Sequence, residues 1–256
     1  MKKNQYQVIV IGAGHAGNEA AAASCNLGVK TLLITMDMNK IGQMSCNPAM
    51  GGIAKGQIVR EIDALGGYSG IVSDISAIQF RMLNRSKGPA MWSPRAQSDR
   101  MLFSAKWREM LENTPNLDFY QDMVHGLVVK DGRVVGVKTG MGNEIEAKAV
   151  VLTNGTFLNG VIHVGEKTFG GGRMAERSAH GITEQLVELG FESDRLKTGT
   201  PPRIDGRSLD YSKMEEQKGD EELTGFSYMD LDKIKPEQQR SCWIAYTSQE
   251  VHDTLK

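Results

Sequence analysis

The sequence predicts an α/β fold built on a parallel sheet. Three apolar runs support this, at residues 8–11, 29–34 and 149–153. The first enters a glycine-rich turn and an alanine-rich stretch, and the last enters a second glycine turn at Gly155. Short apolar runs that alternate with helical segments are typical of parallel strands buried on both faces. We therefore expect a Rossmann-like sheet with its ligand crevice at the carboxyl ends of the strands, beside Gly155.

The first strand and helix are joined by the pattern G-x-G-x-x-G, with its glycines at positions 12, 14 and 17. Gly12 permits the tight turn, Gly14 lets the backbone approach a pyrophosphate, and Gly17 lets the helix pack closely on the strand. The free N–H groups at the start of the helix face the phosphates. Because the pattern stands between a strand and a helix, it favours a dinucleotide site over an ordinary glycine turn. It does not distinguish FAD from NAD.

The second strand lacks the acidic residue that usually holds the ribose hydroxyls at its end. Thr35 stands at this position, and Asp37 follows shortly after as the alternative candidate. The residues alone therefore leave the ribose contact open.

Helical and extended segments continue to alternate through the middle of the chain. After a loop over residues 36–52, we expect a helix from about 53 to 65 with Ile58 and Ile62 on one face. A further helix passes through residues 110–111. Both helices fit the α/β pattern.

Two later segments predict a β-hairpin. Residues 124–129 and 133–139 are rich in β-branched side chains, and they flank the dipeptide Asp131-Gly132. A two-residue Asp-Gly connection is a strong signal for a hairpin turn. The parallel sheet therefore carries a hairpin or meander insertion.

The character of the chain changes after Arg203. Residues 204–240 are dense in charged side chains with little apolar periodicity, and 241–247 then resembles a strand. We place a domain boundary here, with residues 1–203 as the first half of the dinucleotide-binding domain and 204–256 as the start of an inserted α/β domain. No element returns to complete the sheet, so we expect the chain to be truncated.

The composition describes an ordinary globular chain of 256 residues, 40% hydrophobic and 24% charged, with a net charge of −1. The apolar run near the start is too short for a signal peptide or a membrane span, so we expect a cytoplasmic protein that does not contact membranes. Cys25, Cys46 and Cys242 show neither metal-ligand spacing nor a disulfide framework, so we expect no metal. The near-neutral charge excludes an overall basic nucleic-acid binder, while a local basic face stays open.

A second chemical feature is the cysteine in the glycine-rich loop 42–52. Cys46 stands shortly before the helix expected at 53, and Lys55 follows it. A helix N-terminus and a nearby cation both favour the thiolate, which is the nucleophilic form. The alternative is a small residue that fills a loop. Cys25, within the first helix, and His15, in the glycine turn, are expected to pack rather than to react.

Basic residues gather between positions 81 and 100, interrupted by Trp92: Arg81, Arg85, Lys87, Arg95 and Arg100. Such a segment is able to bind RNA phosphates or a flavin pyrophosphate. The alternative is a solvated charged face around a structural turn.

Five separated motifs resemble the glucose-inhibited division protein A family of tRNA uridine 5-carboxymethylaminomethyl modification enzymes. They are residues 12–20 (GAGHAGNEA), 42–49 (GQMSCNPA), 63–67 (DALGG), 84–90 (NRSKGPA) and 196–203 (LKTGTPPR). The resemblance spans the whole chain, and members of the family run far beyond its last residue. It implies that this is an N-terminal fragment, inactive alone, and that Thr35 replaces the usual acid without a compensating residue.

The resemblance implies an FAD enzyme that uses NADH and a methylene-tetrahydrofolate carbon to place an aminomethyl-type group on C5 of the wobble uridine of tRNA. It also implies a GTPase partner and a homodimer, and no DNA. Uracil C5 becomes nucleophilic once a thiolate adds at C6, and Cys46 matches a cysteine of the family. A second functional cysteine of the family would follow Lys256, so the attacking cysteine is left open.

The family's FAD contacts map onto a short set of positions in this chain: Gly12, Ala13, Gly14, His15, Ala16, Gly17, Val124 and Ser178. At Val124 a strand backbone is able to pair with the adenine edge, and the alternative is a plain core valine. Two other functions stay open, a small-molecule FAD oxidoreductase of the fumarate-reductase type and a non-catalytic nucleotide- or partner-binding module. The cysteine loop argues against the former, because hydride transfer to a dicarboxylate needs no nucleophilic thiol.

Overall fold

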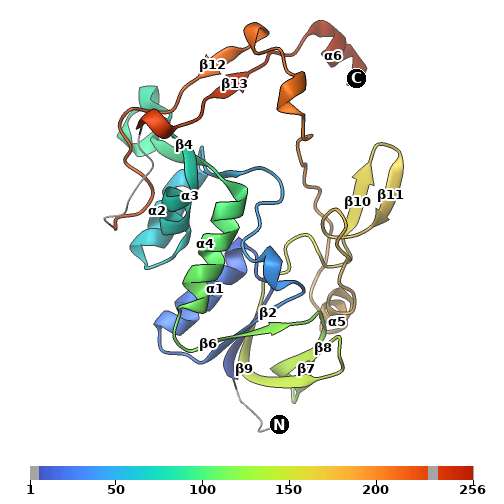
Figure 1. Ribbon diagram of the computed structural model, residues 1–256. Coiled ribbons are helices and arrows are strands. Elements are labelled where there is room, and N and C mark those ends of the chain that lie inside the picture. Colours follow the sequence, from blue (N-terminus) through green and yellow to red (C-terminus); the bar gives the residue numbers. More distant parts are fainter. Residues whose placement is uncertain (1–5, 230–235, 256) are drawn as a thin grey trace.

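The computed structural model describes residues 6–229 and 236–255 (Figure 1). Its main sheet has six strands in the order β6-β2-β1-β9-β8-β7. The strands are β1 (Tyr6–Ile11), β2 (Thr31–Thr35), β6 (Leu117–Gln121), β7 (Val124–Lys130), β8 (Arg133–Thr139) and β9 (Glu144–Leu152). β6, β2, β1 and β9 are parallel, whereas β7, β8 and β9 form an antiparallel meander. This is the Rossmann-like sheet with a meander that the sequence predicts.

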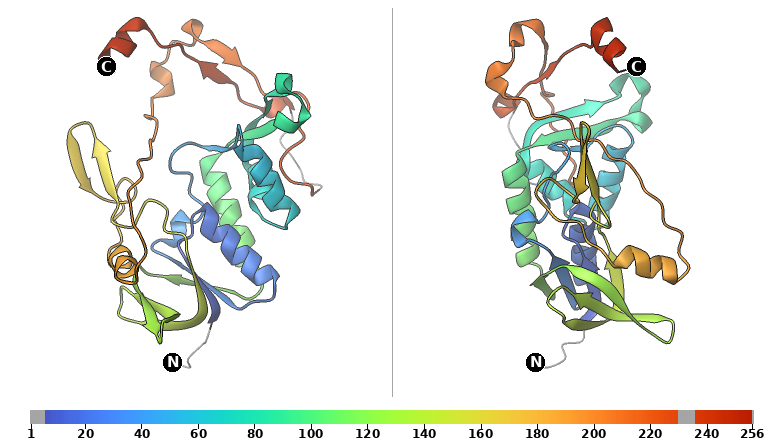
Figure 2. Two further views of the ribbon diagram at one scale, coloured as in Figure 1. Left: turned by 180° about the vertical axis from the view of Figure 1, so that it is seen from behind. Right: turned by 90° about the vertical axis from the view of Figure 1, so that its right-hand side faces the viewer.

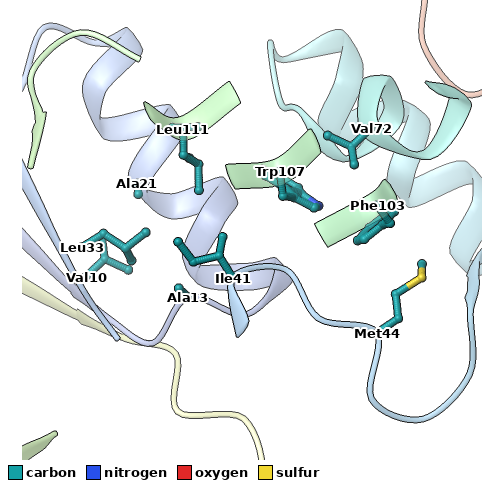
Figure 3. Packing of buried hydrophobic residues seen from close by; sticks show 11 residues of the cluster. Val10, Ala13, Ala21, Leu33, Ile41, Met44, Val72, Phe103, Trp107 and Leu111 are labelled. Atoms are coloured by element: carbon teal, nitrogen blue, oxygen red, sulfur yellow. The ribbon is translucent and has the colours of Figure 1, made fainter. Parts of the chain in front are cut away.

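Strands β1 and β2 send alternate side chains into two different cores, as strands buried on both faces do. Val10 and Leu33 enter the first core, which α1 (His15–Asn26) and α4 (Arg100–Glu112) cover (Figures 1 and 3). Phe103, Trp107 and Leu111 of α4 are fully buried there. The neighbouring strand residues, Ile9, Ile11, Leu32 and Ile34, enter the second core with Ile182 of α5 (Ile182–Glu188).

The β7–β8 hairpin turns where the sequence predicts. Asp131 has a φ of 51° and Gly132 a φ of 72°. Positive φ at both central residues is the requirement of the type I′ turn, which suits the twist of a two-stranded ribbon. The Asp-Gly signal is therefore confirmed.

A second, three-stranded sheet has the antiparallel order β3-β5-β4. It consists of β3 (Ala49–Gly51), β5 (Ser93–Ser98) and β4 (Ala77–Leu83), and α2 (Lys55–Ala64) and α3 (Ser69–Ser76) lie beside it (Figure 1). The helix expected at about 53–65 is thus confirmed. Ile58 is 53% exposed, because α2 packs through Gly56, Val59 and Asp63.

The remaining elements are short. The hairpin of β10 (Val161–Val164) and β11 (Lys167–Gly170) projects from the molecule in the left view of Figure 2. β12 (Glu215–Gln217) and β13 (Cys242–Ile244) pair with each other beyond β4, and α6 (Gln249–Thr254) ends the described chain. Single 3-10 turns occur at Met38–Lys40, Arg85–Lys87, Pro89–Met91, Gly206–Ser208, Tyr211–Lys213 and Pro236–Gln238.

The segment after Arg203 attaches to the small sheet. Phe226 is fully buried against Phe80, and its N–H donates to the buried carboxylate of Asp74 at 2.8 Å. The domain boundary near Arg203 stays a prediction. In residues 6–229 and 236–255, no helix is long and apolar enough to cross a bilayer.

Candidate active site

The glycine turn between β1 and α1 requires glycine at two positions for the sake of the chain itself. Gly12 has a φ of 99°, and its N–H donates to the carbonyl oxygen of Ile34 at 2.8 Å. A Cβ atom on Gly17 would collide with the carbonyl oxygen of Gly12. Gly12 therefore makes the tight turn, and Gly17 allows the close packing of helix on strand, as the pattern predicts.

Gly14 differs from both, because the polypeptide does not require a glycine there. It has φ −75° and ψ −176°, which any residue adopts, and a Cβ atom would meet no atom within 4 Å. Gly14 is the N-cap of α1, which has no side-chain cap and no acidic residue in its first turn. Free N–H groups and the positive end of the helix dipole favour an anion at this place. The open space at Gly14 thus fits a pyrophosphate, which a side chain would obstruct.

Thr153, at the end of β9, supports the turn from the neighbouring strand. Its hydroxyl lies 2.8 Å from the carbonyl oxygen of Ile11 and 3.0 Å from that of Gly12. β9 is parallel to β1, so their carboxyl ends meet at the same edge of the sheet. The turn is therefore fixed by a residue far away in the sequence.

The residues between the glycines divide between core and surface. Ala13 is buried in the first core, and Ala16 is exposed at the start of α1. The ring of His15 packs on Phe103 with centroids 5.2 Å apart, and its Nε2 lies 3.2 Å from the carbonyl oxygen of Gly42. Burial lowers the pKa of His15, so the neutral ring is favoured. His15 therefore packs, as expected.

At the end of β2, both candidates for ribose recognition are engaged locally. The Thr35 hydroxyl lies 3.4 Å from the backbone nitrogen of Asp37. The Asp37 carboxylate accepts a hydrogen bond from the N–H of Asn39 at 2.8 Å and so caps a 3-10 turn. Asp is a preferred N-cap residue, so this contact is a structural role for Asp37. The ribose contact stays open.

Val124 and Ser178 occupy different surroundings. Val124 begins β7 and is buried in the second core with Ile9 and Ile11. Ser178 is half-buried, and its hydroxyl lies 2.9 Å from Nε2 of His180. The structure thus places Val124 beside the central strands, whereas the contacts of both residues with a cofactor stay predictions.

Cys46 lies in an exposed loop between the glycine turn and the small sheet. The loop is anchored by Ile41 and Met44, whose side chains point into the first core (Figure 3). The expected helix does follow the loop, but residues 49–51 pair with β5 and form β3 between Cys46 and the start of α2 at Lys55. The helix dipole is therefore no reason for a reactive thiolate here.

Side chains from two remote segments instead hold this loop. Nη2 of Arg203 donates to the carbonyl oxygen of Cys46 at 2.7 Å and lies 3.3 Å from that of Ser45. Arg173 donates to the Ser45 hydroxyl at 2.8 Å, and the Thr200 hydroxyl lies 3.8 Å from Sγ of Cys46. We call Arg173, Thr200 and Arg203 the loop clamp. It fixes the backbone at Cys46 and leaves the thiol exposed.

The cysteine loop is also tied to the glycine turn. The N–H of Gly42 donates to the carbonyl oxygen of Ala13 at 2.9 Å, next to the His15 contact. At the other end of the loop, the carbonyl oxygen of Pro48 accepts from the N–H of Ser98 at 2.7 Å. Cys46 therefore lies on a short bridge between the dinucleotide turn and the small sheet.

The other two cysteines are shielded. Cys25 is buried in α1, and burial raises the pKa of its thiol. Cys242 is half-buried, and its Sγ donates to Oε1 of Gln79 at 3.2 Å. Within the described ranges, no group of three or more His, Cys, Asp and Glu side chains has the arrangement of a metal site.

The basic segment at 81–100 is more ordered than a charged loop. It contains the end of β4, two 3-10 turns and all of β5. Arg85 pairs with Asp220 at 3.0 Å, and Nε1 of Trp92 donates to the carbonyl oxygen of Arg85 at 3.1 Å. Arg85 thus has a structural partner.

The loop clamp and Thr153 are the site residues that sequence reasoning missed. Thr200 and Arg203 belong to a motif that supported the family resemblance, which was the available signal. Their contacts with residues 45–46 join distant parts of the chain, which no local pattern reveals.

A family model described as glucose inhibited division protein A matches residues 7–256. The tRNA uridine 5-carboxymethylaminomethyl modification enzyme of Flavobacterium johnsoniae is 70% identical over 252 residues, which are 98% of this chain and 40% of that protein. The enzyme of the same name from Christiangramia forsetii is 69% identical over 257 residues, 100% of this chain and 41% of that protein. The chain thus spans about two fifths of the length of these relatives.

Solved structures of the same family are similar to this chain in fold and sequence. The Aquifex aeolicus GidA structure in the form II crystal has a TM-score of 0.94 and 45% identity, over 99% of this chain and 43% of that one. The GidA-related protein from Thermus thermophilus has a TM-score of 0.52 and 25% identity, over 73% of this chain and 69% of that one. Because the family model matches nearly all residues of this chain, the chain belongs to the glucose inhibited division protein A family.

Proposed function

We propose that this chain contributes the dinucleotide site and a reactive cysteine to an FAD-dependent enzyme that modifies the wobble uridine of tRNA at C5. The observation that carries the proposal is the bridge between the two features. Gly42 is hydrogen-bonded to the glycine turn, and the same loop presents the exposed thiol of Cys46. The names of the relatives support the substrate class.

The residues fit FAD at the glycine turn. The open space at Gly14 and the uncapped start of α1 would hold the pyrophosphate, with Gly12 and Gly17 shaping the turn. When bound, FAD supplies redox chemistry by accepting a hydride from NADH. We infer further, from the family resemblance, that methylene-tetrahydrofolate provides the carbon.

Cys46 would act on the uracil ring. Its thiolate adds to C6, so that an S–C6 bond forms and C5 becomes a nucleophilic enolate carbon. C5 then bonds to the methylene carbon of the folate, and a base takes the C5 proton. Tetrahydrofolate leaves as its C–N bond to that carbon breaks, an amine co-substrate bonds in its place, and the S–C6 bond breaks to release the thiolate. The loop clamp holds the backbone at Cys46 and so orients the thiol for this attack.

We also propose, from the resemblance, that the enzyme acts as a homodimer and works with a GTPase partner. From the short N-terminal apolar run and the cysteine pattern, we propose a cytoplasmic location. A small-molecule oxidoreductase of the fumarate-reductase type is the alternative. An exposed cysteine held by three remote side chains favours the tRNA enzyme, because hydride transfer alone needs no thiol.

The test uses a full-length form of the protein with tRNA, NADH, methylene-tetrahydrofolate, an amine co-substrate and the GTPase partner. Mass spectrometry of digested tRNA measures the modified uridine. We expect modification that stops when NADH or the folate is omitted. Oxidation of NADH with no change in the tRNA would contradict the proposal and favour the small-molecule alternative.

A further inference from the structure

Two arginines stand directly opposite each other in the small sheet. Arg81 of β4 and Arg95 of β5 are register partners. The preceding pair in the same ladder, Phe80 and Ala96, packs with Phe226 in the core of this sheet. Because successive residues of a strand point to opposite faces, Arg81 and Arg95 both point to the face away from Phe226.

Polar groups surround that face. Gln79, which shares the face with Arg81, donates its amide to the carbonyl oxygens of Gln217 at 2.9 Å and Arg240 at 3.1 Å. Nη2 of Arg95 lies 3.5 Å from Oε1 of Gln217. The face is therefore partly covered by the β12–β13 pair and contains neutral amides beside the two cations.

No carboxylate compensates the two charges among residues 6–229 and 236–255. Both side chains are half-buried, and the Nε atom of each is buried without a hydrogen-bond partner. Nearby Arg85, by contrast, pairs with Asp220 at 3.0 Å. Like charges directly opposite each other in a sheet are destabilising. An anion between the two guanidinium groups would therefore stabilise the pair. The two arginines therefore form a site that an anionic ligand would complete.

We propose that Arg81 and Arg95 form a phosphate-binding site, and that its ligand is a phosphodiester of the RNA substrate. The guanidinium fork matches a phosphate group and donates two parallel hydrogen bonds. A free phosphate has the same chemistry, but the position of the pair favours RNA. This inference rests on the proposed function.

Strand β3 joins the cysteine loop to the arginine pair. Gly51 of β3 is the register partner of Arg95, and Pro48, which follows the cysteine loop, is hydrogen-bonded to Ser98 at the end of β5. Cys46 therefore leads into the edge strand β3, next to which lie Arg95 on the central strand β5 and Arg81 on the far edge strand β4 of the same small sheet. A nucleotide whose base reaches Cys46 carries phosphates on both sides, and these are suitable ligands.

The first experiment measures binding of a labelled anticodon stem–loop RNA with a wobble uridine to the full-length protein, by fluorescence anisotropy over a range of salt concentrations. Arg81→Gln and Arg95→Gln should each weaken binding about tenfold and lower the slope of log K against log salt by about 0.7. Arg81→Lys and Arg95→Lys should keep the slope, because they keep the charge. Arg133→Gln, at the exposed start of β8, is the matched control and should change neither quantity. Unchanged affinity and slope in both glutamine variants would overturn the inference.

A second measurement uses the unaltered protein and so does not depend on how the variants fold. Phenylglyoxal modifies arginines, and mass spectrometry locates the products. The stem–loop RNA should protect Arg81 and Arg95 but not Arg133. Equal reactivity with and without RNA would overturn the inference, and protection by inorganic phosphate that RNA does not displace would overturn the RNA assignment.

Neither measurement requires carbon transfer, so the two proposals fail separately. RNA binding through the pair without any uridine modification would contradict the proposed function alone. Normal RNA binding by the glutamine variants, in a protein that does modify uridine, would contradict this inference alone.

Discussion

Gly14→Val separates cofactor binding from folding more sharply than any other change in the glycine turn. The new side chain enters open space on ordinary backbone, so the folded chain loses only the difference between glycine and valine as N-cap. In the flavin-free protein that difference is about 1 kcal/mol, and it lowers the melting temperature by no more than roughly 2–4 °C. The pyrophosphate, however, would meet the valine methyl groups. We therefore expect a folded protein that has lost its flavin.

Gly17→Val is the contrasting variant. Its Cβ would collide with the carbonyl oxygen of Gly12, so α1 must move away from β1 at a cost of about 3 kcal/mol or more. Both variants are made in the full-length protein. Flavin absorbance relative to protein absorbance measures cofactor content, and circular dichroism measures melting. Normal flavin content in Gly14→Val would contradict a pyrophosphate beside Gly14. Melting of its flavin-free form as low as that of flavin-free Gly17→Val would contradict the open space at Gly14.

Two further predictions concern the loop clamp and the histidine of the glycine turn. Arg203→Ala removes the donor to the Cys46 carbonyl, so kcat for uridine modification should fall about tenfold at unchanged flavin content. The control variant Arg207→Ala loses only its pair with Asp205 and should keep the normal kcat. An equal loss in both variants would exclude the clamp. Burial lowers the pKa of His15 from 6.5, so protonation favours the unfolded chain, and the stability present above about pH 6.5 is lost as the pH falls. His15→Gln should therefore reduce the decrease in melting temperature below about pH 6.5, and an identical decrease would disprove this assignment.

The parts of the fold that follow from local rules could be predicted from the sequence. The glycine turn depends on the positive φ of Gly12 and the missing side chain of Gly17. Both properties follow directly from the presence of glycine at these positions. The β7–β8 hairpin likewise depends on Asp131 and Gly132. Each feature needs only neighbouring residues, which a sequence pattern contains.

The parts of the fold that depend on contacts between distant residues could not be predicted from the sequence. β3 is three residues long and contains glycine, and it becomes a strand only because β5 supplies hydrogen bonds from across the chain. Ile58 follows the helical period, but the small sheet instead contacts the side of α2 that carries Gly56. The contact between Arg203 and Cys46 joins residues separated by 157 positions. Local patterns do not specify such pairings.

In the proposed function, Cys46 performs the carbon-transfer chemistry beside a flavin that it does not hold. Cys46→Ser in the full-length enzyme tests it, with modified uridine in tRNA and flavin content measured in the same preparation. Serine ionises far less readily than cysteine, so we expect normal flavin content and NADH oxidation but no modified uridine. Normal modification by Cys46→Ser would remove Cys46 from the mechanism, and joint loss of flavin and activity would make it a structural residue of the loop.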